Sequence, residues 1–382
     1  MGSFQLEQED LKLIENVGFS IREMCRLIDA PSNELNTDAF LMEVLSVAEE
    51  LDLKSTVVTG EDLKKEGFGG IWSVGRSGFQ SPSFVVLKHE PKDATKSYCF
   101  VGKGVVFDTG GMQIKGKTGM PGMKRDMGGA AGMLGAYYGL VKSGFKEKLY
   151  LCLAIVENNV TNFANKPDDV ITMLSGKTVE INNTDAEGRL ILADAVYYSK
   201  HTLKVHRSSL ADVIVDMATL TGAQAYVSGK YHAAMLTNCE DFEQRVSLAC
   251  MAGRISGDLV APMVFCPDLH FADLKSPIAD MRNSNLGKME VNCCIHTSSS
   301  LDFPGSPSHS FRALLRLWLD FSSGLTSILE KVSNGCTSTS PLLLSAAIAV
   351  LDTVRRFFAP CLATLLKRRC SLRILLCAVG CL

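Results

Sequence analysis

Hydrophobic residues in the first thirty positions recur every three or four residues among polar ones. Leu11, Val17 and Ile28 belong to this series, and their spacing predicts one amphipathic helix over residues 1–30. From residue 31 to residue 286, short aliphatic or β-branched runs alternate instead with helical stretches. Such alternation is typical of an α/β domain with a mostly parallel central sheet flanked by helices. The predicted strands are 55–60, 83–89, 97–108, 149–156, 178–182, 211–220 and 232–236, and the predicted helices cover parts of 31–51, 126–143, 189–203 and 240–256.

The composition changes again near residue 287. Residues 287–382 contain ten Lys or Arg against five Asp or Glu, and they hold seven of the thirteen cysteines of the 382-residue chain. Their loop-like stretches and their basic, cysteine-rich end do not continue the alternation that precedes them. We therefore predict three regions: an N-terminal helical remnant at 1–30, the α/β domain at 31–286 and a divergent, poorly ordered tail at 287–382.

Charge and hydropathy narrow the range of partners and compartments. A net charge of -2 is not typical of a protein with a general affinity for nucleic acid or for acidic membranes. The start of the chain has neither the basic nor the apolar region of a signal peptide, and no stretch of about 18 residues is continuously apolar. We therefore expect a cytoplasmic protein with neither a nucleic-acid nor a membrane partner.

Four acidic residues stand at positions that favour a shared site. Asp108 ends a predicted strand before Thr-Gly-Gly, so we expect its side chain at the carboxyl edge of the sheet. Asp126 stands at the start of a predicted helix, where exposed N–H groups favour an anion. Asp185 and Glu187 lie two positions apart, so both face the same side of an extended segment. Converging carboxylates repel one another, and oxygen ligands of this kind can hold two divalent cations that activate water and polarise a carbonyl.

Three basic residues belong to the same segments. Lys103 lies in an apolar strand, where a buried ammonium is costly, but beside metal ions its pKa can fall and it can act as a neutral nitrogen ligand. Lys115 and Arg189 can stay charged and stabilise an oxyanion. Taken singly, each acidic residue is more often a cap or a surface group, and Lys103 more often reaches solvent. Nucleotide binding is disfavoured because neither GxxxxGK[ST] nor a correctly placed GxGxxG occurs.

Two motifs connect these residues with a known family. The sequence NTDAEGRL at 183–190 matches the signature of the leucine aminopeptidase (cytosol aminopeptidase, M17) family at every position, and DMATLTGA at 216–223 is near its usual form. The chain resembles this family of metallopeptidases over about residues 27–286, and within it resembles most the probable-aminopeptidase-like branch of animals. The resemblance implies the catalytic-domain fold of the family and the hydrolysis of N-terminal residues from peptides at a dinuclear metal site.

The resemblance also implies a role for each matching residue. Lys115 would polarise the scissile carbonyl and stabilise the tetrahedral intermediate, and Arg189 would hold a bicarbonate that acts as general base. Leu220 would supply a backbone contact, and Asp108 and Glu187 would bridge two zinc or manganese ions. The positions that match metal ligands are Lys103, Asp108, Asp126, Asp185 and Glu187, and those that match substrate-binding residues are Met123, Thr219, Leu220 and Gly222.

The chain departs from the family pattern in three places. Only about thirty residues precede the catalytic part, where the family has a separate N-terminal domain. Residues 166–169 read Lys-Pro-Asp-Asp where the family has RPGD, so we expect an altered turn there. After residue 286 the family completes its catalytic domain, whereas this chain has the divergent tail. Family members form homo-hexamers, and the replacement of that region speaks against the same assembly here.

Two functional hypotheses follow. The first is a metal-dependent aminopeptidase that hydrolyses the N-terminal bond of short peptides or amino-acid amides. The second is a truncated, inactive family member that acts at most as a metal-binding or subunit-interaction fragment. An incomplete domain favours the second, because the apolar faces it exposes cost more than a stability of about 5–15 kcal/mol. The sequence specifies neither the preferred first residue, nor the native metal, nor the physiological substrate.

Overall fold

The centre of the molecule is a sheet of eight strands. The computed structural model describes residues 8–205, 212–229, 231–237, 249–250, 253–254, 258–263 and 271–286, with the backbone of 314–318. In chain order, the strands of the central sheet are β1 (Lys54–Thr59), β2 (Ser83–His89), β3 (Ser97–Asp108), β4 (Lys148–Asn158), β7 (Val213–Ala218), β8 (His232–Thr237), β9 (Leu259–Pro262) and β11 (Leu314–Trp318).

Four of the seven neighbouring pairs in this sheet are parallel. The order across the sheet is β1-β2-β4-β3-β7-β11-β8-β9. The parallel pairs are β4–β3, β3–β7, β7–β11 and β8–β9, whereas β1–β2, β2–β4 and β11–β8 are antiparallel. The predicted α/β class is therefore confirmed, with a sheet that is mixed and parallel at its middle.

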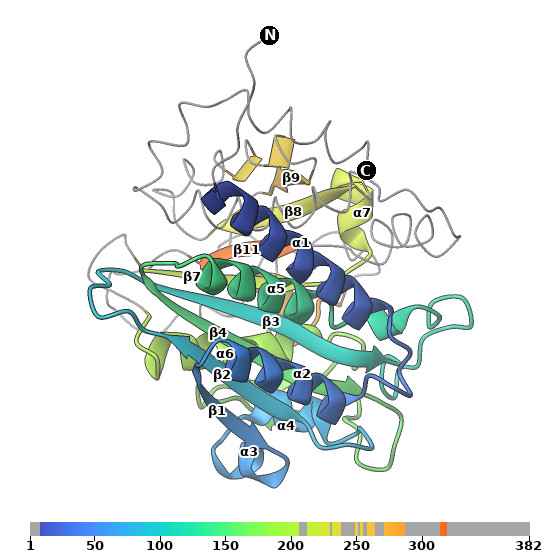
Figure 1. Ribbon diagram of the computed structural model, residues 1–382. Coiled ribbons are helices and arrows are strands. Elements are labelled where there is room, and N and C mark those ends of the chain that lie inside the picture. The colour runs from blue at the N-terminus through green and yellow to red at the C-terminus, as the bar shows by residue number, and fades with distance from the viewer. Residues whose placement is uncertain are drawn as a thin grey trace.

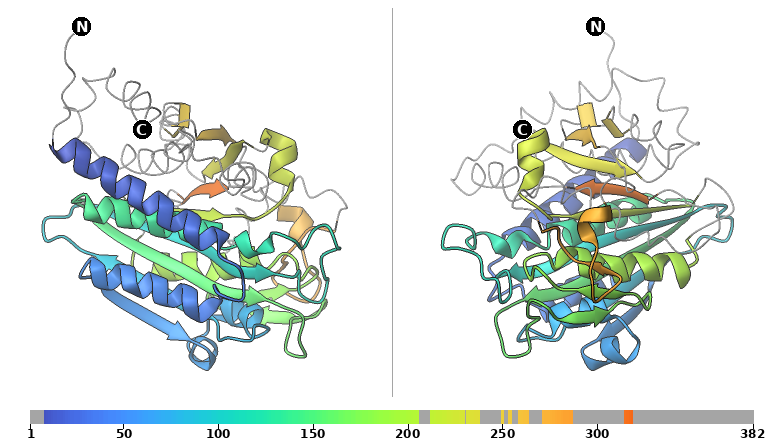
Figure 2. Two further views of the ribbon diagram at one scale, coloured as in Figure 1. Left: turned by 45° about the vertical axis from the view of Figure 1, so that its right-hand side comes forward. Right: turned by 180° about the vertical axis from the view of Figure 1, so that it is seen from behind.

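Helices cover both faces of the sheet and give the molecule three layers (Figures 1 and 2). One face carries α1, α2 and α5, and the other carries α3, α4 and α6. Side chains of β3 alternate between the two cores, with Phe100 in the first and Val101 in the second. The helices are α1 (Gln8–Asp29), α2 (Thr37–Glu50), α3 (Glu61–Lys65), α4 (Gly69–Gly75), α5 (Gly128–Lys142), α6 (Gly188–His201) and α7 (Ala223–Ser228), with short 3-10 turns η1 (Met123–Arg125) and η3 (Phe271–Leu274).

Several predicted elements have the expected bounds. The strands predicted at 83–89 and 97–108 are β2 and β3, and the N-terminal helix is α1. Asn36 caps α2, since its Oδ1 accepts a hydrogen bond of 2.9 Å from the backbone N–H of Ala39. Most of the helix predicted at 240–256 lies outside the described residues. Within the described part of the chain, no helix has the length and hydrophobicity to span a bilayer.

The predicted division into three regions is only partly visible. α1 packs on α5 and contributes to the same core as α2, so the N-terminal helix is part of the same layer. Residues 314–318, from the predicted tail, form β11 between β7 and β8, and the rest of that tail lies outside the described residues. The boundaries at residues 30 and 287 stay a prediction.

A second, smaller sheet joins distant segments of the chain. Its strands are β5 (Val170–Thr172), β6 (Thr178–Glu180) and β10 (Met281–Arg282). β6 pairs antiparallel with β5 and parallel with β10, so that residues 281–282 lie beside residues 179–180. Residues directly after β10 are thereby brought next to the NTDAEGRL segment.

The turn at residues 166–169 is formed without the glycine of the family. Asp168 has a φ of +74°, the left-handed conformation that glycine adopts most easily. The turn is closed by hydrogen bonds from Asp169 N to Lys166 O at 3.1 Å and from Lys166 N to the Asp169 carboxylate at 2.9 Å, and Asp168 N donates to Ile181 O at 2.8 Å. The departure therefore places backbone strain at an exposed position, and an altered turn relative to the family stays a prediction.

Replacement of Asp168 by glycine should stabilise the protein. We expect Asp168→Gly to raise the free energy of unfolding by about 0.5–1 kcal/mol, because relief of the left-handed strain outweighs the added chain entropy. Asp169→Gly is the matched control and should destabilise, since it removes the acceptor of Lys166 N. Urea denaturation measures both, and equal effects of the two changes would contradict the assignment of strain to Asp168.

Asp194 of α6 holds the N-terminus of α4 from the neighbouring helix. Its Oδ2 accepts hydrogen bonds from Gly70 N and Ile71 N at 2.7 and 3.1 Å, and its Oδ1 accepts one from Leu174 N at 2.8 Å. The side chain is almost fully buried. Burial raises the pKa of Asp194 to about 7, although the three backbone N–H donors act in the opposite direction.

This raised pKa predicts a pH-dependent stability. The folded pKa of Asp194 is about 7, above the usual value near 3.9. The protonated side chain therefore contributes stability that is fully present below the unfolded pKa and is lost as the pH rises through 7. The difference in unfolding free energy between the parent protein and Asp194→Asn should therefore fall by about 2–3 kcal/mol between pH 5 and pH 8. Urea titrations across this range measure it, and a constant difference would refute the shift.

Candidate metal centre

Asp108 is positioned by the end of β3 and by the turn that follows. Its Oδ1 accepts hydrogen bonds from Gly110 N at 2.9 Å and from Asn158 Nδ2 at 2.8 Å. Gly110 and Gly111 have φ values of +86° and +67°, so the chain reverses directly after the strand. Because Asn158 ends the parallel neighbour β4, the carboxylate lies at the carboxyl edge of the sheet, as predicted.

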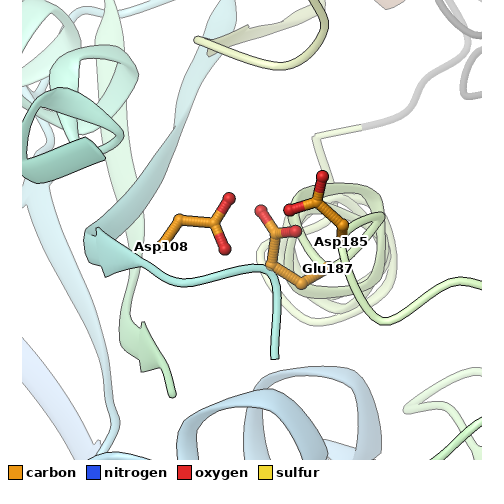
Figure 3. Close-up of side chains that lie close together, drawn as sticks. All are labelled: Asp108, Asp185 and Glu187. Atoms are coloured by element: carbon orange, nitrogen blue, oxygen red, sulfur yellow. The ribbon is translucent and has the colours of Figure 1, made fainter. Parts of the chain in front are cut away.

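Asp185 and Glu187 reach the same point from the other side. Their segment is a turn that leads into α6, so the prediction of an extended segment is wrong. The turn nevertheless brings them together: one oxygen each of Asp108, Asp185 and Glu187 lie within 4.8 Å of one another. Figure 3 shows the three carboxylates facing a common point, Asp108 from its strand and the other two from the start of the helix.

Lys103 joins the cluster from the interior of β3. Its Nζ lies 2.8 Å from Asp126 Oδ2 and 2.9 Å from Glu187 Oε1, and it donates to Thr219 O at 3.1 Å. The side chain is only 2% exposed, so it does not reach solvent as an isolated lysine would. Asp126 follows η1 and lies two residues before α5, so the prediction that it starts the helix is slightly displaced. Thr219 Oγ1 also donates to Asp126, at 2.7 Å.

Lys115 bridges two of the carboxylates on the opposite side. Its Nζ lies 2.8 Å from Asp108 Oδ2 and 2.5 Å from Asp185 Oδ1. The loop that carries Lys115 is fixed by Gln113, whose side chain and backbone exchange hydrogen bonds with Thr184 at 2.6 and 2.8 Å. The loop with Lys115 and the loop with Asp185 and Glu187 are thus hydrogen-bonded to each other.

The electrostatics of the cluster favour additional positive charge. Burial raises the pKa of both Asp185 and Glu187, and the nearby charge of Asp108 raises each further. Burial also raises the pKa of Asp126 well above its usual range, against the influence of Lys103. Four carboxylates face only two ammonium groups, and Glu187 Oε2 is buried without a hydrogen-bond partner among the described residues. Such a donor set fits divalent cations, which bind carboxylate oxygens and remove their mutual repulsion.

The two lysines are charged in this arrangement. Burial opposes the charge of Lys103, but Asp126, Glu187 and Asp108 outweigh it and raise its pKa. Burial likewise opposes the charge of Lys115, and Asp108 leads the carboxylates that raise its pKa. The predicted neutral form of Lys103 therefore requires cations between the carboxylates, because only they would reverse this balance.

A pocket of about 150 Å³ opens beside the cluster. Ten of the eleven residues predicted as site residues from the sequence line this pocket. The exception is Glu187, which forms an ion pair with Lys103. Arg189 is nearly buried in its wall, and its Nη1 donates to Asn283 O at 2.7 Å. The predicted substrate-binding residues are therefore next to the cluster, whereas their individual roles stay predictions. Lining residues that were not assigned a site role from the sequence are Gly122, Arg125, Asn183, Ala186 and Thr221.

A family comparison agrees with this geometry. Residues 23–297 match the model of the cytosol aminopeptidase family, catalytic domain. The chain belongs to the cytosol aminopeptidase family. The match extends slightly beyond both ends of the predicted resemblance at residues 27–286.

Individual family members from animals are similar over most of the chain. Leucine aminopeptidase 1 of Caenorhabditis elegans is 60% identical over 286 residues, which cover 75% of this chain and 56% of that protein. The probable aminopeptidase NPEPL1 of Mus musculus is 51% identical over 280 residues, which cover 73% and 52% respectively. The predicted similarity to an animal branch is confirmed. The chain spans about half the length of these relatives.

Solved structures of the cytosol aminopeptidase family share the fold. The leucine aminopeptidase LAP1 of Caenorhabditis elegans superposes with a TM-score of 0.79 at 49% identity, over 93% of this chain and 68% of that one. The leucyl aminopeptidase of Trypanosoma brucei in complex with bestatin gives 0.77 at 33% identity, over 90% and 62%. The predicted catalytic-domain fold is thereby confirmed.

The glycine of NTDAEGRL has a steric reason in this member of the family. A Cβ at Gly188 would lie 2.6 Å from Lys103 Cε and 2.7 Å from Leu220 Cδ1, closer than side-chain atoms approach. Lys103 has no space to retreat in its buried strand.

Gly188→Ala should therefore displace Lys103 and weaken divalent-metal binding about 10- to 100-fold, in the range seen when groups around a metal site are altered. Gly116→Ala is a matched control, because nothing lies within 4 Å of a Cβ at that position. Calorimetric titration with zinc measures both variants, and parent-like affinity of Gly188→Ala would contradict the expected displacement.

Proposed function

We propose that the chain is a dinuclear metallo-aminopeptidase that removes N-terminal residues from short peptides or amino-acid amides. The proposal is supported by the convergence of Lys103, Asp126 and Glu187 with Asp108 and Asp185 beside a pocket. These five residues would hold two divalent ions, zinc or manganese. When bound, such ions supply a Lewis acid for the scissile carbonyl and lower the pKa of water.

Two positively charged side chains of the pocket, those of Lys115 and Arg189, would act on the substrate directly. The raised pKa of Lys115 keeps it protonated at neutral pH, so it can donate a hydrogen bond to the oxygen that becomes negative as the carbonyl is attacked. Arg189 lies in the wall of the same pocket, where it would hold a bicarbonate that accepts the proton, with a backbone contact from Leu220. Lys115 lies in the loop that follows β3 and Arg189 lies in the first turn of α6, directly after the proposed ligands Asp185 and Glu187.

The substrate would enter with its free amine towards the carboxylates. Met123, Thr219 and Gly222 line the pocket and would surround the first side chain of the peptide. Because this pocket is small and the amine is bound at its base, only the terminal bond would reach the reacting groups. This arrangement gives an exopeptidase.

Two further expectations belong to this proposal. A cytoplasmic location is supported by relatives that are named cytosol aminopeptidases. Homo-hexamer formation, which the family resemblance implies, stays a prediction for a chain that covers about half of those relatives. The mass of the purified protein in solution tests it directly.

Metal content and hydrolysis of leucine amide by the purified, monodisperse protein test the function. We expect about two divalent ions per chain and turnover of the amide, and we expect Glu187→Gln to lose both, since it neutralises a ligand at the buried centre of the cluster. Glu157→Gln is the matched control: this partly buried carboxylate at the end of β4 bonds to Asn159, outside the cluster, and should retain metal and activity.

The same measurement separates the two hypotheses. Metal uptake without hydrolysis by the parent protein would support the inactive, metal-binding fragment. Unchanged hydrolysis by Glu187→Gln would refute the assignment of the site.

A further inference from the structure

Asn283 lies beside the NTDAEGRL segment although it follows it by almost one hundred residues. It comes directly after β10, whose pairing with β6 sets Arg282 opposite Glu180. The backbone N–H of Asn283 donates to Glu180 O at 3.0 Å, which extends this pairing by one step. Only 3% of the residue is exposed.

The side chain of Asn283 is hydrogen-bonded entirely to the loop that carries the ligands. Its Oδ1 accepts from Asn182 N at 3.0 Å and from Asn183 N at 3.2 Å. Its Nδ2 donates to Asn183 O at 2.6 Å and to Ala186 O at 3.3 Å. Two acceptor sites and two donors are all that an amide offers, so the group is fully used.

This pattern requires asparagine and fixes the orientation of its amide. A flipped amide would set N–H against N–H at Asn182 and oxygen against oxygen at Ala186. Aspartate would keep the acceptor but lose both donors, and would place a negative charge against two carbonyl oxygens. Serine is too short and has only one donor.

The backbone carbonyl of Asn283 also binds Arg189, the arginine predicted to be catalytic. Arg189 Nη1 donates to Asn283 O at 2.7 Å, and both groups are buried. Asn283 is thus bonded to Asn182 and Asn183 before the two carboxylates, to Ala186 between them and to Arg189 after them. Since residues 182–187 form neither helix nor strand, their path depends on such contacts and on the Gln113–Thr184 pair.

We propose that Asn283 is a positioning residue that sets the carboxylates of Asp185 and Glu187 and the guanidinium of Arg189 in register with one another. The inference rests on the proposed function, because the register matters for holding metal ions and a substrate. Groups that orient the ligands of a metal change its affinity by about 10- to 100-fold when they are removed. Asn283 acts through the loop and touches neither ions nor substrate.

Asn283→Asp tests the proposal, with Arg282→Ala as the matched control. Arg282 is the preceding residue, pairs with Glu180 at 3.2 Å and donates to Lys275 O at 2.8 Å, and has no hydrogen bond to residues 182–189. Both variants are therefore expected to lose stability, but only the first is expected to release the loop. If Asn283→Asp does not fold, Asn283→Ser, which is neutral and smaller, takes its place.

Three measurements are made on the chain of 382 residues. Hydrogen exchange followed by mass spectrometry, with chelator present, should show faster exchange at residues 182–189 in Asn283→Asp alone. Zinc titration should show about 10- to 100-fold weaker binding in that variant and parent-like binding in Arg282→Ala. At saturating zinc, leucine amide hydrolysis by Asn283→Asp should retain a lowered kcat, because the loop with Asp185 and Glu187 is no longer held in register with Arg189.

The outcomes separate the two proposals. Parent-like exchange and zinc affinity in Asn283→Asp would overturn the positioning role while leaving the aminopeptidase assignment intact. A parent protein that binds no zinc and hydrolyses no amide would overturn the proposed function. In that case the exchange data alone decide whether Asn283 holds the loop, with unchanged exchange again counting against it.

Discussion

Four carboxylates that face one another at the edge of a sheet are the constraint on which the rest of this structure depends. Their repulsion has to be balanced within the protein, and the buried Lys103 and the partly buried Lys115 supply part of that balance. The carboxylates come from three segments, the end of β3, the residue after η1 and the turn before α6, and Lys103 lies within β3 itself. Packing of the core therefore holds these carboxylates closer together than they would remain in solution.

The local part of this arrangement was predictable from the sequence. Asp108 could be placed at the carboxyl edge because its strand is a continuous apolar run that ends in Thr-Gly-Gly, and both signals are local. The family resemblance, of which NTDAEGRL is one part, implied the remaining ligands together. The turn conformation of Asp185 and Glu187 was missed because the hydrogen bonds that shape it come from Gln113 and Asn283, far away in the sequence.

The helix α4 was missed for a different reason. Residues 67–70 contain three glycines, which disfavour a helix when judged by propensity alone. α4 forms because its N-terminal N–H groups are bonded by Asp194 of α6 and its apolar face is buried in the core. Gly70 also permits the approach, since a Cβ there would lie 2.4 Å from Leu190 O. Tertiary contacts, which no short sequence window contains, decide this element.

The place of Asn283 in the chain has a consequence for biosynthesis. Ninety-six positions separate it from Glu187. At ribosomal rates of about 5–20 residues per second, the loop with Asp185 and Glu187 therefore emerges roughly 5 to 20 seconds before Asn283. The strands β1 to β4 and their helices can pack during that interval, whereas the loop cannot yet take its final path. The loop with Asp185 and Glu187 would thus reach its final path late, after the segments of β1 to β4 have been made.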